Sequence, residues 1–163
     1  MKFSIKNVTA IIVINLLLLT SHIFADAGRL SPVASFWGPE EDWRLGYFLS
    51  QAGDVNGDGY DDFMIGAYHD CTRGFNAGVV YLFLGRSSLN WGKDCPVKTA
   101  DHIFYGRQEY DLLGFNFSGG GDINGDGYSD ILIGAPGNWE GKPYAGEAFV
   151  MLGSPTPQWN KNT

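Results

Sequence analysis

The fold of this chain follows from one stretch of nine residues, Asp54-Val55-Asn56-Gly57-Asp58-Gly59-Tyr60-Asp61-Asp62. A near copy lies 68 residues further on, Asp122-Ile123-Asn124-Gly125-Asp126-Gly127-Tyr128-Ser129-Asp130. Each copy places oxygen-bearing side chains at its positions 1, 3, 5 and 9, and glycines where the chain must turn sharply. A short loop of this composition can wrap around a hard cation, and calcium is the first candidate.

The same 68-residue offset extends well beyond the two loops. Matching residues are Phe36 and Phe104, Gly38 and Gly106, Glu41 and Glu109, Leu45-Gly46 and Leu113-Gly114, Ser50 and Ser118, Ile65-Gly66-Ala67 and Ile133-Gly134-Ala135, Ala77-Gly78 and Ala145-Gly146, and Leu84-Gly85 and Leu152-Gly153. The chain therefore contains one structural unit repeated in register.

The first 25 residues have the features of a secretory signal. Lys2 and Lys6 form a basic start, residues 10–19 an apolar run broken only by Asn15, and Ile23-Phe24-Ala25 a cleavage site. The apolar run is shorter than the roughly 20 residues that a membrane-spanning helix needs. We therefore expect a secreted, extracellular protein, or a periplasmic one in a bacterium, without a transmembrane segment after cleavage.

The charge of the chain excludes some classes of partner. The formal net charge is −7, and it becomes −9 when Lys2 and Lys6 leave with the signal. An exported acidic chain is a poor candidate for binding nucleic acid or anionic lipid. The only cysteines are Cys71 and Cys95. We expect them to form a disulfide, because an even pair in an exported chain usually bonds.

Each repeated unit is expected to form four short strands and no helix. The expected strands are 34–37, 46–51, 62–67 and 79–84 in the first unit, and 102–105, 114–119, 130–135 and 148–152 in the second. They are rich in aromatic and branched residues and are bounded by glycine. Four strands in up-and-down order form one blade of a β-propeller, and the acidic loop then joins the second strand of each blade to the third.

The expected fold class is therefore all-β, with two four-stranded antiparallel propeller blades. The expected division is a signal peptide at 1–25, a first blade with its linker at 26–98, a second blade at 99–154 and a tail at 155–163. An EF-hand is excluded, because Ile65 and Ile133 occupy the twelfth position, where that loop needs a bidentate carboxylate, and no flanking helices are expected.

With these elements in place, the chain resembles the FG-GAP repeats, which form the β-propeller of integrin α-subunits. The first copy of the family pattern reads Phe36-Trp37-Gly38, Leu45-Gly46, 53–62, Ile65-Gly66-Ala67 and 78–85. The second copy reads Phe104-Tyr105-Gly106, Leu113-Gly114, 121–130, 133–136 and 146–153.

The resemblance implies two calcium sites. The family's ligands fall on the side chains of Asp54, Asn56, Asp58 and Asp62 with the carbonyl of Tyr60, and on those of Asp122, Asn124, Asp126 and Asp130 with the carbonyl of Tyr128. Asp61 is not an expected ligand, because its counterpart is Ser129. Magnesium is the main rival ion, but a loop that supplies five or more protein oxygens favours the looser geometry of calcium.

The chain departs from the family in the number of its blades. Integrin-type propellers close with seven blades, whereas two are expected here. A wedge of two blades is an incomplete propeller that leaves apolar flanks exposed. Self-association that completes a propeller, assembly with other repeat proteins, and a piece of a longer propeller all remain open.

The leading functional hypothesis is a non-enzymatic extracellular module for protein interaction or adhesion, in which calcium is structural. Its partner is expected at the loops 68–77 and 136–145. The alternative is an accessory domain of an exported hydrolase, since FG-GAP-like repeats accompany phospholipases and polysaccharide-degrading enzymes, or a carbohydrate-binding module, which the five tryptophans would suit. No Gly-x-Ser-x-Gly, His-Glu-x-x-His or phosphate-binding loop is present. The sequon Asn116-Phe117-Ser118 falls on an expected strand, so no glycan is expected there.

Overall fold

The computed structural model describes residues 32–38, 40–88, 91–139, 142, 145–157 and 159. The expected signal peptide at 1–25 lies outside these residues. The regular structure of the described residues is β-strand, apart from one 3-10 helix, η2 (Val97–Thr99). Among them, no helix is long and apolar enough to cross a membrane.

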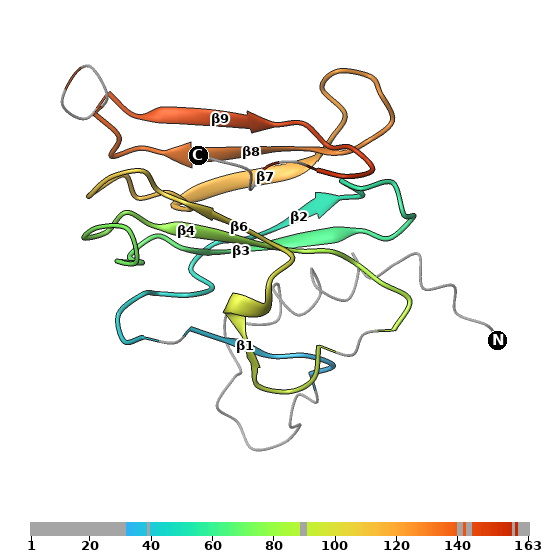
Figure 1. The fold of residues 1–163 in the computed structure, drawn as a ribbon, viewed down its shortest axis with the longest axis horizontal. Helices are drawn as coiled ribbons and strands as arrows, with labels where there is room; N and C mark the ends of the chain where they lie inside the picture. The colour runs from blue at the N-terminus through green and yellow to red at the C-terminus, as the bar shows by residue number, and fades with distance from the viewer. Residues whose placement is uncertain are drawn as a thin grey trace, which may run out of the picture.

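In the described part of the chain, nine strands form three sheets. In chain order they are β1 (Phe36–Trp37), β2 (Leu49–Gly53), β3 (Asp62–Ala67), β4 (Val79–Phe83), β5 (Cys95–Pro96), β6 (His102–Tyr105), β7 (Asn116–Gly121), β8 (Asp130–Ala135) and β9 (Glu147–Met151). The first sheet has the order β2-β3-β4-β6 and the second sheet the order β7-β8-β9, both antiparallel. Figure 1 shows the second sheet stacked above the first. The expected all-β class of incomplete propeller blades is confirmed.

The third strand of each unit, at 62–67 and 130–135, forms as expected. The first strands also form, at 36–37 and 102–105, but their pairing differs from the expected blades. Strand β6 was expected to begin the second blade. It instead pairs with β4, with Phe104 opposite Val80, and completes the first sheet. Strand β1 pairs in parallel with β5, in a separate two-stranded sheet. The sequence repeat is thus offset by one strand from the sheets. The physical reason is that the backbone groups along the outer edge of β4 need partners, and β6 supplies them.

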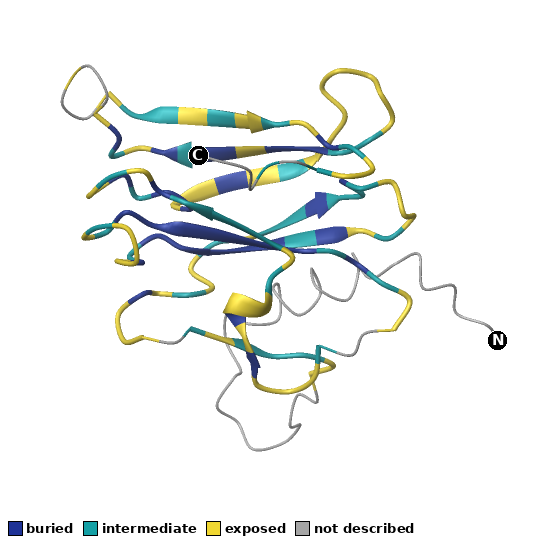
Figure 2. Ribbon diagram, viewed as in Figure 1, coloured by how far each residue is buried: buried dark blue, intermediate teal, exposed yellow. Residues whose placement is uncertain are grey.

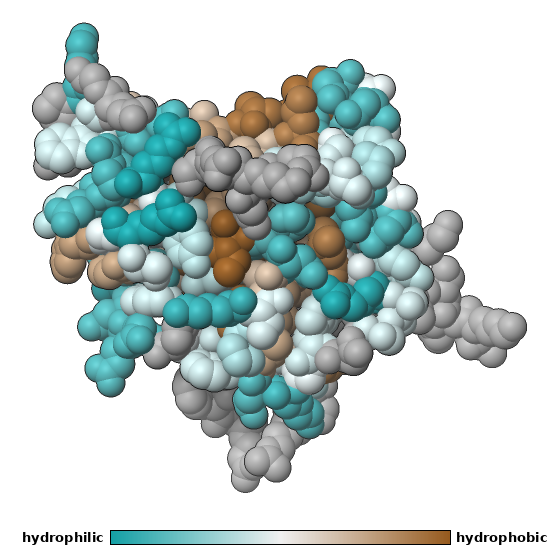
Figure 3. All heavy atoms as spheres, in the orientation of Figure 1, coloured by the Kyte–Doolittle hydropathy of each residue, from teal (hydrophilic) through white to brown (hydrophobic). Residues whose placement is uncertain are grey.

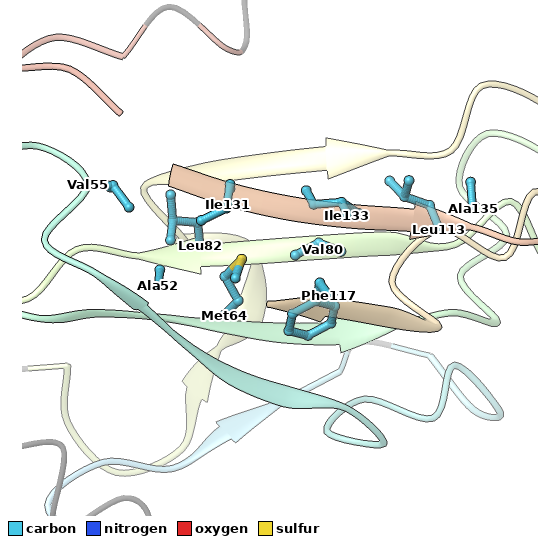
Figure 4. Packing of buried hydrophobic residues seen from close by; sticks show 10 residues of the cluster. All are labelled: Ala52, Val55, Met64, Val80, Leu82, Leu113, Phe117, Ile131, Ile133 and Ala135. Atoms are coloured by element: carbon cyan, nitrogen blue, oxygen red, sulfur yellow. The ribbon is translucent and has the colours of Figure 1, made fainter. Parts of the chain in front are cut away.

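Side chains alternate along β3 and β4 between the two faces of the first sheet. Met64 and Leu82 point to the second sheet, whereas Ile65 and Phe83 point away from it. The inter-sheet cluster consists of Ala52, Val55, Met64, Val80 and Leu82 from the first unit and Leu113, Phe117, Ile131, Ile133 and Ala135 from the second (Figure 4). The opposite face of the first sheet carries the cap cluster, Trp43, Ile65, Ala67, Val79, Tyr81, Phe83 and Val97.

Candidate metal centres

The first acidic loop turns around the carboxylate of Asp54. Its Oδ1 accepts hydrogen bonds from the backbone N–H groups of Gly57 at 2.7 Å and Asp58 at 3.1 Å, and its Oδ2 from Gly59 at 2.8 Å. Gly57 and Gly59 have φ values of 75° and 87°. Side-chain-bearing residues rarely adopt this left-handed conformation, so the glycines are what lets the loop close on the carboxylate.

The second acidic loop repeats this geometry closely. Asp122 accepts hydrogen bonds from Gly125 at 2.7 Å, Asp126 at 3.1 Å and Gly127 at 2.8 Å. These hydrogen bonds, first of all the one from Gly127, hold the pKa of the Asp122 carboxyl below its usual range, because they stabilise its ionised form.

The ninth residue of each loop fixes the loop to its sheet. Asp62 is buried and accepts hydrogen bonds from the N–H groups of Val55 at 2.9 Å and Gly85 at 2.7 Å. Asp130 is buried as well, and accepts from Ile123 at 2.7 Å and Gly153 at 2.8 Å. The Asp62 carboxylate therefore connects the start of the first loop to the segment that follows β4. The Asp130 carboxylate connects the start of the second loop to the segment that follows β9.

The first loop concentrates negative charge around a buried acid. Burial first of all, and then the nearby carboxylates of Asp58 and Asp54, raise the pKa of Asp62 to about 7, although the backbone hydrogen bonds from Gly85 and Val55 act in the opposite direction. An ionised Asp62 is therefore unfavourable in this loop unless positive charge compensates it. A bound divalent cation would supply that charge.

The donor set suits a hard cation. In the first loop, Asn56 Nδ2 donates to Asp58 Oδ2 at 3.0 Å, and Asp58 Oδ1 accepts from the N–H of Tyr60 at 2.9 Å. Within the described residues, no group of three or more His, Cys, Asp or Glu side chains is arranged to hold a metal ion. The carboxylates instead accept from backbone amides, yet each oxygen has a second lone pair. The all-oxygen set of three carboxylates, one amide and one carbonyl is of the kind that calcium prefers.

The two loops differ in their surroundings. The first loop lies against the second sheet, where the carbonyl oxygen of Val55 accepts a hydrogen bond from the N–H of Ser154 at 2.9 Å. Residues 121–127 of the second loop are all exposed. The two expected sites therefore share their internal geometry, but residues 121–127 of the second loop face solvent, whereas Val55 of the first loop is buried between the sheets.

The expected disulfide is not formed in the structure, which holds both cysteines as free thiols. Cys71 is exposed in the loop after β3, with its Sγ 3.3 Å from the carbonyl oxygen of His69. Cys95 is buried in β5, with its Sγ 3.0 Å from Thr99 Oγ1. Cys95 lies in β5, which pairs with β1, whereas Cys71 lies in the loop after β3, and no sequence pattern indicated the pairing of β5 with β1.

Among the residues that the structure describes, two buried acids lie outside the acidic loops. Asp70, expected in a partner-binding loop, is wholly buried and accepts a hydrogen bond from the N–H of Thr72 at 2.7 Å, so it shapes its own loop. Asp111 was not singled out in the sequence. Its Oδ2 accepts from the N–H groups of Arg107 at 2.8 Å and Gln108 at 3.1 Å. Its counterpart in the first unit is Trp43, so the repeat offered no signal.

Comparison with known proteins matches both units to the same family. The sequence pattern of the FG-GAP repeat matches residues 46–83 and 114–151. The chain is 39% identical over 92 residues to integrin alpha-PS2 of Drosophila melanogaster, covering 56% of this chain and 6% of that protein. It is 34% identical over 131 residues to integrin alpha-5 of Xenopus laevis, covering 77% and 12%. With integrin alpha pat-2 of Caenorhabditis elegans the identity is 32% over 118 residues, covering 71% and 9%. The chain thus spans about a tenth of the length of these relatives or less.

Proposed function

Because the chain carries two FG-GAP repeats and belongs to the FG-GAP repeat family, we propose that it is a calcium-binding, non-enzymatic extracellular module for protein interaction or adhesion. The relatives named above are integrin alpha subunits, and no enzyme family is indicated. In this proposal Asp54, Asn56, Asp58 and Asp62 with the Tyr60 carbonyl hold one ion. Asp122, Asn124, Asp126 and Asp130 with the Tyr128 carbonyl hold the other.

The observation that carries the proposal is the duplicated hydrogen-bond network of the two loops. Asp54 and Asp122 each accept three backbone N–H bonds of closely similar lengths, and Asp62 and Asp130 are both buried at the base. A turn that served only to reverse the chain would need glycine and asparagine, but not three carboxylates in each copy. Their accumulation favours a site for a divalent cation.

The proposed role of calcium is structural. Each loop connects two strands of a sheet. Its ninth residue also accepts a hydrogen bond from a glycine after the sheet's next strand, Gly85 after β4 or Gly153 after β9. An ion in the loop would therefore stiffen three segments at once. Extracellular modules bind calcium with dissociation constants of about 10⁻⁴ to 10⁻³ M, so the sites would stay filled outside the cell and would not act as a switch.

Calcium titration of the chain by isothermal calorimetry tests this proposal. The expected result is two bound ions per chain. Asp58→Asn and Asp126→Asn each remove one carboxylate from a single loop, so each variant should lose one of the two binding events. Partner binding through other loops is a separate measurement, for which the calcium-loaded chain is the starting material.

The matched control is Asp61→Ser, which gives the first loop the residue that the second loop carries at Ser129. It removes the same unit of charge from an exposed position that is not a proposed ligand. If Asp61→Ser weakened calcium binding as much as Asp58→Asn, general electrostatic attraction would explain the binding and the assigned ligands would be wrong. Absence of binding at millimolar calcium would refute the calcium proposal itself.

A further inference from the structure

Each acidic loop contains an Asn-Gly pair, Asn56-Gly57 in the first loop and Asn124-Gly125 in the second. Glycine has no side chain, so its backbone nitrogen can approach the side-chain carbonyl carbon of the preceding asparagine with little steric hindrance. In an unfolded chain, an asparagine in this setting is therefore prone to deamidation. The proposed role of the two asparagines as calcium ligands does not use this reactivity.

Deamidation needs no reactant other than water. The backbone nitrogen of the glycine forms a bond to the side-chain carbonyl carbon Cγ of the asparagine. The bond from Cγ to Nδ2 breaks, and ammonia leaves with the proton of the backbone nitrogen. Water then opens the resulting five-membered imide at one of its two carbonyl carbons. The product is an aspartate, or an isoaspartate in which the main chain runs through the former side chain.

Both loops are open to the water that the second step consumes. They lie at the same end of the two sheets, and Figure 2 shows the tips of both loops exposed. The exposed residues are 57–59 in the first loop and 121–127 in the second. Figure 3 shows mainly hydrophilic and neutral residues on this side of the molecule. Exclusion of solvent therefore protects neither pair, and only the conformation of the loops can oppose the reaction.

The hydrogen bonds of the first loop hold both reacting groups in place. The N–H of Gly57 donates to Asp54 Oδ1 at 2.7 Å. The side-chain amide of Asn56 is fixed at both ends, since its Nδ2 donates to Asp58 Oδ2 and its Oδ1 accepts from the N–H of Asp58, both at 3.0 Å. The Gly57 nitrogen has to leave the Asp54 carboxylate, and the amide has to leave Asp58, before the new bond can form.

The second loop restrains its pair in the same way. The N–H of Gly125 donates to Asp122 Oδ1 at 2.7 Å. Asn124 Nδ2 donates to Asp126 Oδ2 at 2.9 Å, and Asn124 Oδ1 accepts from the N–H of Asp126 at 3.2 Å. The same three hydrogen bonds therefore surround each Asn-Gly pair.

The ring of Tyr128 adds a restraint on the first pair. A Cβ built on Gly57 would clash with this ring, so the ring lies directly against the Gly57 backbone. A Cβ built on Gly125 would meet nothing within 4 Å. Rotation of the peptide between Asn56 and Gly57 is thus opposed by a residue of the other loop as well as by the hydrogen bonds.

We propose that Asn56 and Asn124 are protected modification sites, which convert to aspartate or isoaspartate only when the loop that holds them opens. An isoaspartate adds a carbon atom to the main chain just before the glycine, and so displaces the N–H groups that now meet Asp54 or Asp122. A loop converted in this way cannot regain its geometry, so a transient opening becomes a permanent change. The proposal depends on the hydrogen bonds of the loops, and stands whether or not they bind calcium.

Peptide mapping by mass spectrometry tests the proposal on the full chain, incubated at neutral pH in excess chelator. Electron-transfer fragmentation distinguishes isoaspartate from aspartate. Conversion at both asparagines should be slower by roughly tenfold or more in the folded chain than in the chain unfolded by urea, because the reaction passes through the opened loop. Equal rates in the folded and the unfolded chain would overturn the proposal. Chelator in both samples keeps this result independent of the calcium titration.

Asp54→Ala and Asp122→Ala identify the restraint, since each removes the acceptor of the glycine N–H from one loop. Each should speed conversion by roughly fivefold or more in its own loop and change the other loop by less than about twofold. Asp61→Ser is the control, because it removes a carboxylate from the first loop that does not accept the N–H of Gly57. It should leave both rates unchanged. Equal acceleration at both asparagines in either alanine variant would assign the protection to the stability of the whole chain, and the proposal would be wrong.

Tyr128→Ala gives an independent readout if the aspartate variants do not fold. It removes the ring from Gly57 and leaves the hydrogen-bonding groups of both pairs in place. Conversion should become faster at Asn56, by roughly twofold or more, and stay unchanged at Asn124. Tyr60→Ala is the matched control in the first loop, and should leave conversion at Asn124 unchanged. An unaltered rate at Asn56 in Tyr128→Ala would contradict the restraint assigned to that ring.

Discussion

The backbone N–H of Ser129 donates a hydrogen bond of 2.9 Å to the carbonyl oxygen of Asp54, and so joins the two acidic loops directly. Asp54 uses its side chain to close the first loop and its carbonyl to hold the second sheet. The conformation of the first loop and the contact between the sheets are therefore linked. No equivalent sheet lies against the second loop among the described residues.

Loss of calcium from the first loop should destabilise the chain more than loss from the second. At a calcium concentration of ten times the dissociation constant, a bound ion contributes roughly 1.4 kcal/mol to stability. Asp58→Asn should lower the thermal midpoint further than Asp126→Asn, because two carbonyls of the first loop, those of Asp54 and Val55, accept the hydrogen bonds from Ser129 and Ser154 that hold the second sheet. Thermal melts check this order when they are run in roughly 2 mM calcium, which is above the dissociation constants of extracellular calcium modules, and again in excess chelator. Equal losses would indicate that the two loops are energetically independent of the sheet contact.

Truncation of a buried residue and of its exposed counterpart should give different losses. Met64→Ala removes a wholly buried side chain from the inter-sheet cluster and should cost about 2–5 kcal/mol in free energy of unfolding. Leu132→Ala acts at the equivalent position of the second sheet, which is 42% exposed, and should cost about 0.5 kcal/mol or less. Urea unfolding of both variants provides the values. Similar losses would mean that Leu132 is covered in solution.

Gly57→Ala in the first loop should destabilise the chain more than Gly125→Ala in the second loop. Gly57 and Gly125 have nearly the same φ, 75° and 76°, so alanine costs about 1–2 kcal/mol of backbone strain at either position. A Cβ at Gly57 would also clash with the ring of Tyr128, whereas a Cβ at Gly125 would meet nothing within 4 Å. Gly57→Ala should therefore show the larger drop in thermal midpoint. An equal drop would show that strain alone accounts for both.

Acid should weaken the fold through His102. Burial lowers the pKa of His102 from its ordinary value of 6.5, while Asp101 acts in the opposite direction. The unfolded chain then takes up the proton more readily than the folded chain, so this contribution to stability is complete above pH 6.5 and is lost as the pH falls through the folded pKa. His102→Phe keeps a ring opposite Trp159, whose centroid lies 5.3 Å away, and removes the titration.

Urea midpoints at pH 7.5 and pH 5.5 in constant calcium measure the effect. The natural chain should lose more stability between these values than the His102→Phe variant, since all other titrating groups are common to both chains. An identical loss in the two chains would assign the pH dependence to other groups, of which His69, whose pKa is also lowered by burial, is the first candidate.

Local sequence was sufficient to predict the third strand of each unit and the course of the two loops. Strands 62–67 and 130–135 form as expected, because a short apolar run bounded by an acidic turn and a Gly-Ala pair favours a buried strand. The turn residues Gly57, Gly59, Gly125 and Gly127 all adopt the positive φ that the pattern requires. The near identity of the loops was thus carried over into near identity of their hydrogen bonds.

The repeat by itself determined the all-β class, the two units and the residues gathered in each loop, because all of these depend on neighbours close in the chain. Only the tertiary structure decided that β6 completes the first sheet, that β5 pairs with β1, and that Val55 is buried where Ile123 is exposed. Those outcomes depend on which sheet lies against which. The two units carry similar apolar residues at equivalent positions, so the repeat pattern cannot predict which sheet face will be buried against another sheet.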